Sequence, residues 1–185
     1  MLRITGGTLR GRRLCPLKKS DIRPTTDYFK QMIFNILADR VAGSVVLDLF
    51  AGTGSLAIEA LSRGASMAVL VDNHTQAVKL SARNISVFGL DRQCVVLKRD
   101  ILKGLAFLKA RGRVFDLVFM DPPYDRAMGL TTLNLLERSE CLASSALVVV
   151  EHSRREPLPE KVGSLEQIRQ RGHGNTLVSF YESVV

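Results

Sequence analysis

The chain has 185 residues and a net charge of +8, which suits one full-sized domain with an extension rather than two domains. A hydrophobic content of 46% with 24% charged residues excludes a disordered chain. No apolar run reaches the roughly 18 residues of a membrane span, and no apolar signal region opens the chain, so we expect a cytosolic protein.

The cysteines and histidines suggest neither a disulfide framework nor a metal site. The three cysteines are odd in number, widely spaced and without a C-x-x-C pair, and the three histidines lack metal-ligand spacing. We therefore expect reduced, buried or half-buried thiols and no bound metal.

A basic segment opens the chain. The Gly6-Gly7 pair lies between short extended stretches and predicts a small hairpin, with Leu9–Leu14 as its second strand. Positive charge gathers in this part of the chain, at Arg3, Arg10, Arg12, Arg13, Lys18, Lys19 and Arg23, opposed only by Asp21. The local excess predicts contact with the phosphates of a polyanionic partner, the alternative being a solvated basic tail.

A helix follows this segment. The sequence from Arg23 to Asp27 has the character of a turn and a helix start, and apolar residues then recur with helical spacing, which predicts a helix from about Thr26 to Ala38. We expect its apolar side to pack on the main domain, with Arg23 and Lys30 available to a ligand near its beginning.

From Ser44 onward, strands and helices alternate. The predicted strands are 45–50, 67–71, 94–97, 115–120 and 145–151, and the predicted helices are 55–63, 75–88, about 100–110 and about 130–137. Near-continuous Val and Leu strands alternating with helices predict an open, mostly parallel, doubly wound α/β sheet. We expect a basic extension over residues 1–43 that contacts a polyanionic partner, and a main domain over 44–185.

The end of the chain departs from this alternation. Residues 165–171 and 176–182 flank Gly172-His173-Gly174 and predict an antiparallel hairpin added to the edge of the sheet. Ligands of such folds bind beyond the carboxyl ends of the parallel strands. Those ends carry four carboxylates, at Asp48, Asp72, Asp100 and Asp121.

A glycine-rich turn joins the first main strand to its helix. It contains Gly52 and Gly54, where the backbone turns sharply and can lie against a ligand. Asp72 follows 18 positions after Gly54, at the end of the next strand, where a carboxylate can accept both hydroxyls of a ribose. Together these features favour a cofactor that contains adenosine over a purely structural turn.

The choice between adenosine cofactors depends on the residues around this turn. Gly52-x-Gly54-x-x-Ala57 also fits the dinucleotide fingerprint. Asp48, just before the turn, would repel a pyrophosphate but could attract an ammonium group or its ordered water, which disfavours NAD. Asp100 could accept a hydrogen bond from the adenine amino group with Ile101 against the ring, or could be a helix N-cap, and the two roles are compatible.

The segment Asp121-Pro122-Pro123-Tyr124 ends the strand over residues 115–120. Two prolines cannot continue a strand ladder because neither has an N–H to donate. The result is a stiff corner with a carboxylate, carbonyls and an aromatic ring, suited to a planar ligand. The alternative is a strand-terminal cap followed by a half-buried ring.

These motifs resemble those of known enzyme families. The glycine turn with the Asp121–Tyr124 corner resembles class I AdoMet-dependent methyltransferases that modify exocyclic amino groups of bases. More narrowly, blocks along almost the whole chain resemble the RsmD-type 16S rRNA guanine-N2 methyltransferases. These blocks are Arg3–Gly7, Leu9–Arg12, Arg23–Asp27, Phe34–Leu37, Asp48–Leu56, Glu59–Ala65 and Val178–Tyr181. One block differs, because Tyr28-Phe29-Lys30-Gln31 replaces the Arg-x-Arg-Glu type segment usual in the family.

The resemblance implies a Rossmann-like class I methyltransferase fold with a seven-stranded sheet, S-adenosylmethionine (AdoMet) as cofactor, and 16S rRNA in an assembling or assembled small ribosomal subunit as partner. The implied cofactor-binding residues are Asp48, Phe50, Ala51, Gly52, Gly54, Asp72, Asn73, Asp100 and Ile101. The implied RNA-binding residues are Arg3, Arg10, Arg12, Arg13 and Arg23. The implied catalytic residues are Asp121, Pro122, Pro123 and Tyr124.

The chemistry of the corner suits a guanine amine. The N2 lone pair is delocalised into the ring, so holding its hydrogens between the Asp121 carboxylate and the Pro122 carbonyl would direct the lone pair at a sulfonium methyl group. Tyr124 would stack on the base after the base leaves its stack. Two alternatives stay open: an adenine-N6 methyltransferase acting on DNA or RNA, and a non-catalytic RNA-binding assembly protein.

Overall fold

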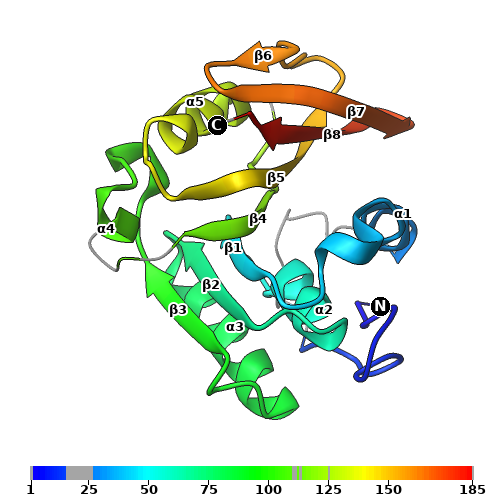
Figure 1. The fold of residues 1–185 in the computed structure, drawn as a ribbon. Coiled ribbons are helices and arrows are strands. Elements are labelled where there is room, and N and C mark those ends of the chain that lie inside the picture. Colours follow the sequence, from blue (N-terminus) through cyan, green and yellow to red (C-terminus); the bar gives the residue numbers. More distant parts are fainter. Residues whose placement is uncertain (1, 16–26, 110–111, 113, 125, 185) are drawn as a thin grey trace. The chain divides into compact units, whose positions relative to one another are not determined.

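The structure, a computed structural model, describes residues 2–15, 27–109, 112, 114–124 and 126–184. The chain divides into two compact units, Met1–Arg99 and Asp100–Val185. Figure 1 labels the helices and strands of the chain. Within the described ranges, no helix is both long and apolar enough to cross a membrane. The same ranges contain no cluster of three His, Cys, Asp or Glu side chains that could hold a metal ion.

The first unit is built on three parallel strands in the order β3-β2-β1. These are β1 (Val45–Leu49), β2 (Met67–Asp72) and β3 (Cys94–Lys98). Their Val- and Leu-rich sequences suit strands that are covered on both faces, and β1 and β2 are almost wholly buried. Two helices, α2 (Ser55–Ser62) and α3 (Thr75–Phe88), connect and pack against these strands.

Local sequence sets where these helices begin and end. Gly54 precedes α2 with a φ of 77°, and Gly89 ends α3 with a φ of 71°, a left-handed conformation that glycine adopts at no steric cost. All eight residues of α2 are buried. Helix α1 (Asp27–Leu37) buries four of the five apolar positions that set its predicted periodicity, Phe29, Ile33, Phe34 and Leu37, whereas Ile36 is half-buried. The 3₁₀ turn η1 (Ala38–Arg40) follows it.

The N-terminal segment forms the predicted pairing, but its turn lies elsewhere. Arg3 and Arg13 form an antiparallel bridge, and the Ile4 N–H donates to the Arg12 carbonyl at 2.9 Å. The chain reverses over residues 8–11 rather than at Gly6-Gly7. Gly7 instead lies against the backbone carbonyl of Ser62 at the end of α2, where a Cβ atom would clash.

The second unit combines a parallel strand pair with an antiparallel extension, in the order β4-β5-β8-β7-β6. The strands are β4 (Phe115–Met120), β5 (Leu142–Ser153), β6 (Lys161–Val162), β7 (Leu165–His173) and β8 (Thr176–Ser183). Its helical elements are η2 (Ile101–Lys103), α4 (Ala106–Lys109) and α5 (Met128–Glu137).

These strand pairings confirm the predicted α/β architecture with a C-terminal antiparallel hairpin. Two details differ. The helix predicted over about residues 100–110 is divided into η2 and α4, because Gly104 has a φ of 103° that no helix can accommodate. The described residues form eight strands where seven were expected. The additional one is the two-residue strand β6, which is too short to have a periodicity of its own.

Candidate functional site

The turn between β1 and α2 has an unusual backbone. Phe50, Gly52 and Gly54 all have positive φ, at 69°, 53° and 77°. For a non-glycine residue such as Phe50 this conformation costs about 1–2 kcal/mol. The Ala51 N–H donates to the Val71 carbonyl at 3.0 Å, and the Gly54 N–H donates to the Ala51 carbonyl at 2.7 Å. The turn is therefore a fixed and strained feature, as is common at functional sites.

The two glycines of this turn have different surroundings. Among the described residues, a Cβ atom on Gly52 would have only the Phe50 carbonyl oxygen near it, at 3.9 Å, so this part of the chain leaves open space beside the Gly52 backbone. A Cβ atom on Gly54 would lie 2.9 Å from Leu70 Cδ2 and 3.4 Å from Ser81 Cβ. Gly52 thus leaves room for a ligand to approach. At Gly54, the close packing of Leu70 and Ser81 leaves no room for a side chain. The contact of Gly54 with a cofactor stays a prediction.

Asp72, the last residue of β2, is brought to the glycine turn. One carboxylate oxygen accepts the Gly52 N–H at 2.9 Å, and the other accepts the His74 N–H at 2.8 Å. Each carboxylate oxygen has a second lone pair, so both can still accept a hydroxyl donor. Asn73, between these partners, is exposed.

Asp48 lies in β1 and is 2% exposed. Its carboxylate accepts the Ala57 N–H of α2 at 3.2 Å. Burial raises the pKa of Asp48 to about 7, opposed by this hydrogen bond and supported by the nearby charge of Asp72. Ser55, which follows the turn, has a buried hydroxyl oxygen with no hydrogen-bond partner in the described part of the chain. The first unit therefore places buried polar groups without full pairing around the turn.

Asp100 begins the second unit and is a helix N-cap. Its carboxylate accepts the Leu102 N–H at 3.1 Å at the start of η2, which confirms one of its two predicted roles. Ile101 is 3% exposed. The adenine contacts predicted for both residues stay predictions.

The corner after β4 is held by its aromatic ring. Asp121 is half-buried, Pro122 is buried and Pro123 is exposed. The Tyr124 hydroxyl donates to Glu151 Oε1 at 2.6 Å and lies 3.2 Å from Thr176 Oγ1. Burial raises the pKa of Tyr124, and the charge and hydrogen bond of Glu151 raise it further. The Tyr124 hydroxyl is therefore protonated at neutral pH, and its hydrogen bond to Glu151 holds the ring in position.

Two of these partners were missed from the sequence. Glu151 follows the apolar run Val148–Val150 of β5, and an acid ending such a run resembles Asp121 after β4, which is a signal that could have identified it. Thr176 begins β8 and reaches Tyr124 through the antiparallel pairing of β5 with β8. No local pattern indicates a contact of that kind.

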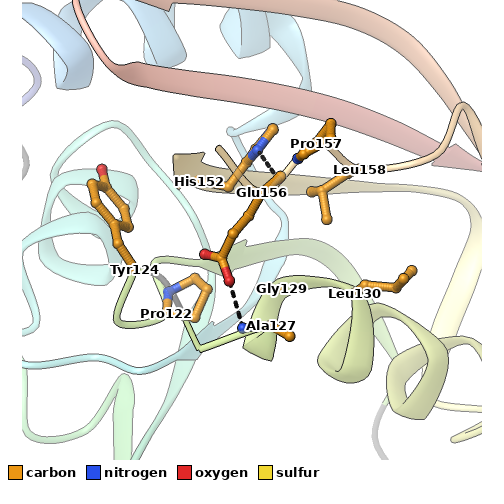
Figure 2. Close-up of a pocket in the computed structure, with 9 residues that line it drawn as sticks. All are labelled: Pro122, Tyr124, Ala127, Gly129, Leu130, His152, Glu156, Pro157 and Leu158. Carbon is orange, nitrogen blue, oxygen red and sulfur yellow. Dashed lines mark hydrogen bonds between the residues drawn. The ribbon is translucent and has the colours of Figure 1, made fainter. Parts of the chain in front are cut away.

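A pocket of about 170 Å³ adjoins the corner in the second unit (Figure 2). Its lining comes from the corner, the start of α5 and the segment after β5: Pro122, Tyr124, Ala127, Gly129, Leu130, His152, Glu156, Pro157 and Leu158. His152 is 2% exposed, and burial lowers the pKa of its imidazole. His152 Nδ1 lies 3.0 Å from the Glu156 carbonyl oxygen, and His152 Nε2 lies 2.9 Å from Ser179 Oγ. The imidazole therefore links the segment after β5 to β8.

The predicted RNA-binding arginines fall into two groups. Arg3 pairs with Asp27 at 2.7 Å, and Arg12 lies 4.5 Å over the Phe88 ring and donates to the Val87 carbonyl. Arg10 and Arg13 are exposed, and neither takes part in the ion pairs found among the described residues. Arg23 lies outside the described residues. Arg10 and Arg13 are thus the arginines of residues 2–15 whose charge is least engaged by the protein.

The N-terminal segment is anchored by a buried glutamate. Glu59 is fully buried in α2, and its carboxylate accepts the Thr5 N–H at 2.7 Å, the Thr5 hydroxyl at 2.8 Å and the Arg63 side chain at 2.9 Å. Lys30 was expected to be available to a ligand, which is wrong. It is fully buried, its ammonium group donates to the Arg3 carbonyl, and burial lowers its pKa.

Asn84 connects this segment to the glycine turn. It is 1% exposed in α3, its Oδ1 accepts the Cys15 N–H at 2.8 Å, and its Nδ2 donates to the Thr53 carbonyl at 2.9 Å. The same Nδ2 lies 3.5 Å from the Cys15 carbonyl. One buried amide therefore fixes both the end of the basic segment and a residue of the turn, a contact that the sequence did not indicate.

Comparisons with known proteins extend over the whole chain. Residues 2–182 match the family described as conserved hypothetical protein 95. Ribosomal RNA small subunit methyltransferase D of Escherichia coli K12 is 33% identical over 98% of this chain and 89% of its own. The protein of the same name from Haemophilus influenzae is 34% identical, and the match covers 85% of this chain and 81% of that protein. The structure of yhhF from Escherichia coli covers 100% of this chain and 98% of its own, with 30% identity and a TM-score of 0.86. The chain therefore belongs to this family, that of the RsmD-type methyltransferases.

Proposed function

We propose that this methyltransferase transfers a methyl group from AdoMet to the exocyclic N2 amino group of a guanine in 16S rRNA of the small ribosomal subunit. The observation that carries the proposal is the Asp121–Tyr124 corner, whose ring is held by the hydrogen bond from Tyr124 to Glu151 at 2.6 Å. The names of the relatives in Escherichia coli and Haemophilus influenzae support small-subunit rRNA as the substrate.

The residues of the first unit fit AdoMet. Open space beside Gly52 admits the cofactor close to the backbone, and Asp72 keeps acceptor capacity for two ribose hydroxyls. Asp48 offers a buried carboxylate to the ammonium group of the methionyl part. The unpaired Ser55 hydroxyl is a further polar atom for this region. When bound, AdoMet supplies a methyl group activated by a sulfonium.

The residues of the corner act on the amine. The Asp121 carboxylate and the Pro122 carbonyl each accept one N2 hydrogen, which directs the nitrogen lone pair out of the plane of the guanine and supports positive charge on the nitrogen. The bond from N2 to the methyl carbon forms as the carbon–sulfur bond breaks, and its electron pair stays on sulfur. N2 then loses one proton, through Asp121 or directly to water. Tyr124 holds the base plane by stacking.

The direct experiment uses tritiated AdoMet with unmodified 16S rRNA, supplied either as a transcript or as partly assembled subunits. We expect label in the RNA and N2-methylguanosine when the digested nucleosides are analysed by mass spectrometry. Label in N6-methyladenosine would instead support the adenine alternative. An absence of label on every RNA and particle would refute the proposed function, while AdoMet binding without label would support the non-catalytic assembly protein.

Replacing Asp121 tests the chemistry of the corner. We expect Asp121→Ala to lower the turnover rate by about 10²–10³-fold, while AdoMet binding measured by calorimetry stays unchanged. Asp116→Ala is the matched control, since Asp116 is an exposed carboxylate on the neighbouring strand β4. Unchanged turnover of the Asp121 variant would remove this residue from the mechanism.

A further inference from the structure

The pocket beside the corner contains one carboxylate, that of Glu156. Figure 2 shows this side chain reaching across the pocket from the segment after β5 toward Pro122 and Ala127. Around it the pocket is lined mainly by apolar groups, including Leu130, Pro157 and Leu158. A charged acceptor in such surroundings is suited to a planar ligand that presents hydrogen-bond donors at its edge.

Glu156 is held in position through its side chain and through its backbone. Its Oε1 accepts the Ala127 N–H just before α5. Its backbone is fixed as well, because the Glu156 N–H donates to the Ser153 carbonyl at 3.0 Å and the Glu156 carbonyl lies 3.0 Å from His152 Nδ1. The carboxylate is therefore positioned before any ligand binds. A carboxylate offers about four acceptor sites, so the Ala127 N–H does not exhaust its capacity.

We propose that this pocket receives the target base and that Glu156 selects guanine by accepting its N1–H. The inference rests on the proposed function, in which Asp121 and Pro122 hold the neighbouring N2 amine. Guanine presents N1–H and N2–H₂ as adjacent donors on one edge, and Pro122 and Tyr124 of the corner line the same pocket as Glu156. A base with its amine at the corner therefore directs its next donor into the pocket.

The same geometry rejects adenine. When the adenine N6 amine occupies the corner, the neighbouring ring atom is N1, which is an acceptor. An ionised carboxylate can only accept, so Glu156 and adenine N1 would oppose each other with two lone pairs and no hydrogen between them. A site built to bind a donor strongly disfavours a ligand that lacks it, because an acceptor that the ligand covers loses its hydrogen-bond partner.

The test substitutes 2-aminopurine for the target guanine. 2-Aminopurine keeps the amine at C2 but has an unprotonated N1 and lacks the carbonyl oxygen at C6. The comparison of enzyme variants on the same two bases therefore separates the reading of N1 by Glu156 from any effect of the missing oxygen. After the methylated position is mapped, each base is placed there in a 16S rRNA transcript by splinted ligation. The kcat/KM for guanine and for 2-aminopurine is measured in the wild-type enzyme, in Glu156→Gln and in Glu137→Gln.

We expect the wild-type enzyme to prefer guanine by at least about tenfold, and Glu156→Gln to reduce that preference to about threefold or less, because the glutamine amide can donate to an unprotonated N1. Glutamine keeps an oxygen for the Ala127 N–H, so the fold is preserved. Glu137 also accepts a backbone N–H, from Ser164 at 3.3 Å, and Glu137→Gln should retain the wild-type preference.

Two results would overturn the inference while leaving the proposed function intact. One is a Glu156→Gln enzyme that keeps the full preference for guanine. The other is an equal loss of activity on both bases, which would make Glu156 a purely structural residue. Failure of the proposed function is distinguishable from both, because the wild-type enzyme would then form no N2-methylguanosine on any transcript.

Discussion

Gly52 and Gly54 are two residues apart in one turn, and both have positive φ. Their difference lies in what surrounds the missing side chain, which is open space at Gly52 and the packed Leu70 and Ser81 side chains at Gly54. One glycine therefore belongs to ligand binding and the other to the packing of the first unit. Each role makes its own prediction.

We predict that Gly52→Ala mainly weakens AdoMet binding, whereas Gly54→Ala mainly lowers stability. Both substitutions carry the left-handed strain of about 1–2 kcal/mol, and Gly54→Ala adds about 1–3 kcal/mol for overpacking. Calorimetric Kd values and thermal unfolding of both variants measure the two effects. If Gly54→Ala proved the more stable variant, the packing role of Gly54 would be contradicted.

Asp48 makes AdoMet binding depend on pH. Its raised pKa, about 7, means that the free protein carries a proton on much of Asp48 just below neutral pH. A bound ammonium group favours the ionised carboxylate, so we expect binding to release a proton and the affinity to fall by up to about tenfold per pH unit below pH 7. Asp48→Asn should remove this part of the dependence, as calorimetry in buffers of different ionisation enthalpy can show.

The same residue affects the stability of the free protein. A carboxyl group with a raised pKa in the folded state stabilises the fold at low pH, and this contribution is lost as the pH rises from the unfolded value of 3.8 through about 7. The thermal stability of Asp48→Asn relative to wild type should therefore increase between pH 5 and pH 8. A constant difference across that range would contradict the raised pKa.

At the scale of elements, Asn84 of α3 holds the basic segment and the glycine turn together. Its amide has one acceptor facing an N–H and one donor facing carbonyl oxygens, so neither a carboxylate nor an alkyl group can replace it. The element that carries much of the positive charge and the element proposed to bind AdoMet thus share one buried side chain. A change at this position affects both.

We predict that Asn84→Asp destabilises the protein by about 1–3 kcal/mol, because a second acceptor would face the Thr53 carbonyl. AdoMet binding should weaken in parallel, and hydrogen exchange over residues 2–15 should accelerate. Asn134→Asp is the matched control, because Asn134 is an exposed helical residue that donates to the Leu130 carbonyl at 2.9 Å. Equal effects of the two variants would refute the bridging role.

Most helices and strands could be predicted from the sequence, because the periodicity of apolar residues in strands such as β4 and helices such as α3 is visible within each segment. The signals for Gly52, Asp72 and the Asp121–Tyr124 corner are also local. The contacts of Glu59, Asn84 and Glu151 were not predictable, because each joins segments that are distant along the chain. Lys30 was predicted wrongly for the same reason: helical spacing places it near the start of α1, but only the packing of Arg3 over it reveals its burial.

At the scale of the whole molecule, the net charge of +8 matters through its distribution. Arg3 and Arg12 stabilise the basic segment through an ion pair and a hydrogen bond to other parts of the protein. Arg10 and Arg13 are exposed. The residues that bring the segment into place are thus distinct from those left to contact phosphates. Salt dependence of RNA binding can separate the two kinds.

We predict that the double variant Arg10→Ala/Arg13→Ala lowers affinity for 16S rRNA and reduces the slope of log K against log salt by about 1.4–1.8, as expected for two lost contacts. Filter binding at several salt concentrations measures this, with thermal unfolding to show an unchanged fold. Arg138→Ala, an exposed arginine on the other compact unit, serves as the control. A slope equal to that of wild type would exclude both residues from the phosphate contacts.

The close approach of Gly7 to Ser62 also makes the N-terminal segment and the end of α2 dependent on each other's sequence. Gly7 has a φ of 72° and leaves no room for a side chain over the Ser62 carbonyl, while Thr5 depends on Glu59 for its hydrogen bonds. Residues 2–15 and the end of α2 must therefore be compatible with each other for the segment to dock. A chimaera that takes its N-terminal segment from a relative should fold only if the residues matching Glu59–Arg63 come from the same parent.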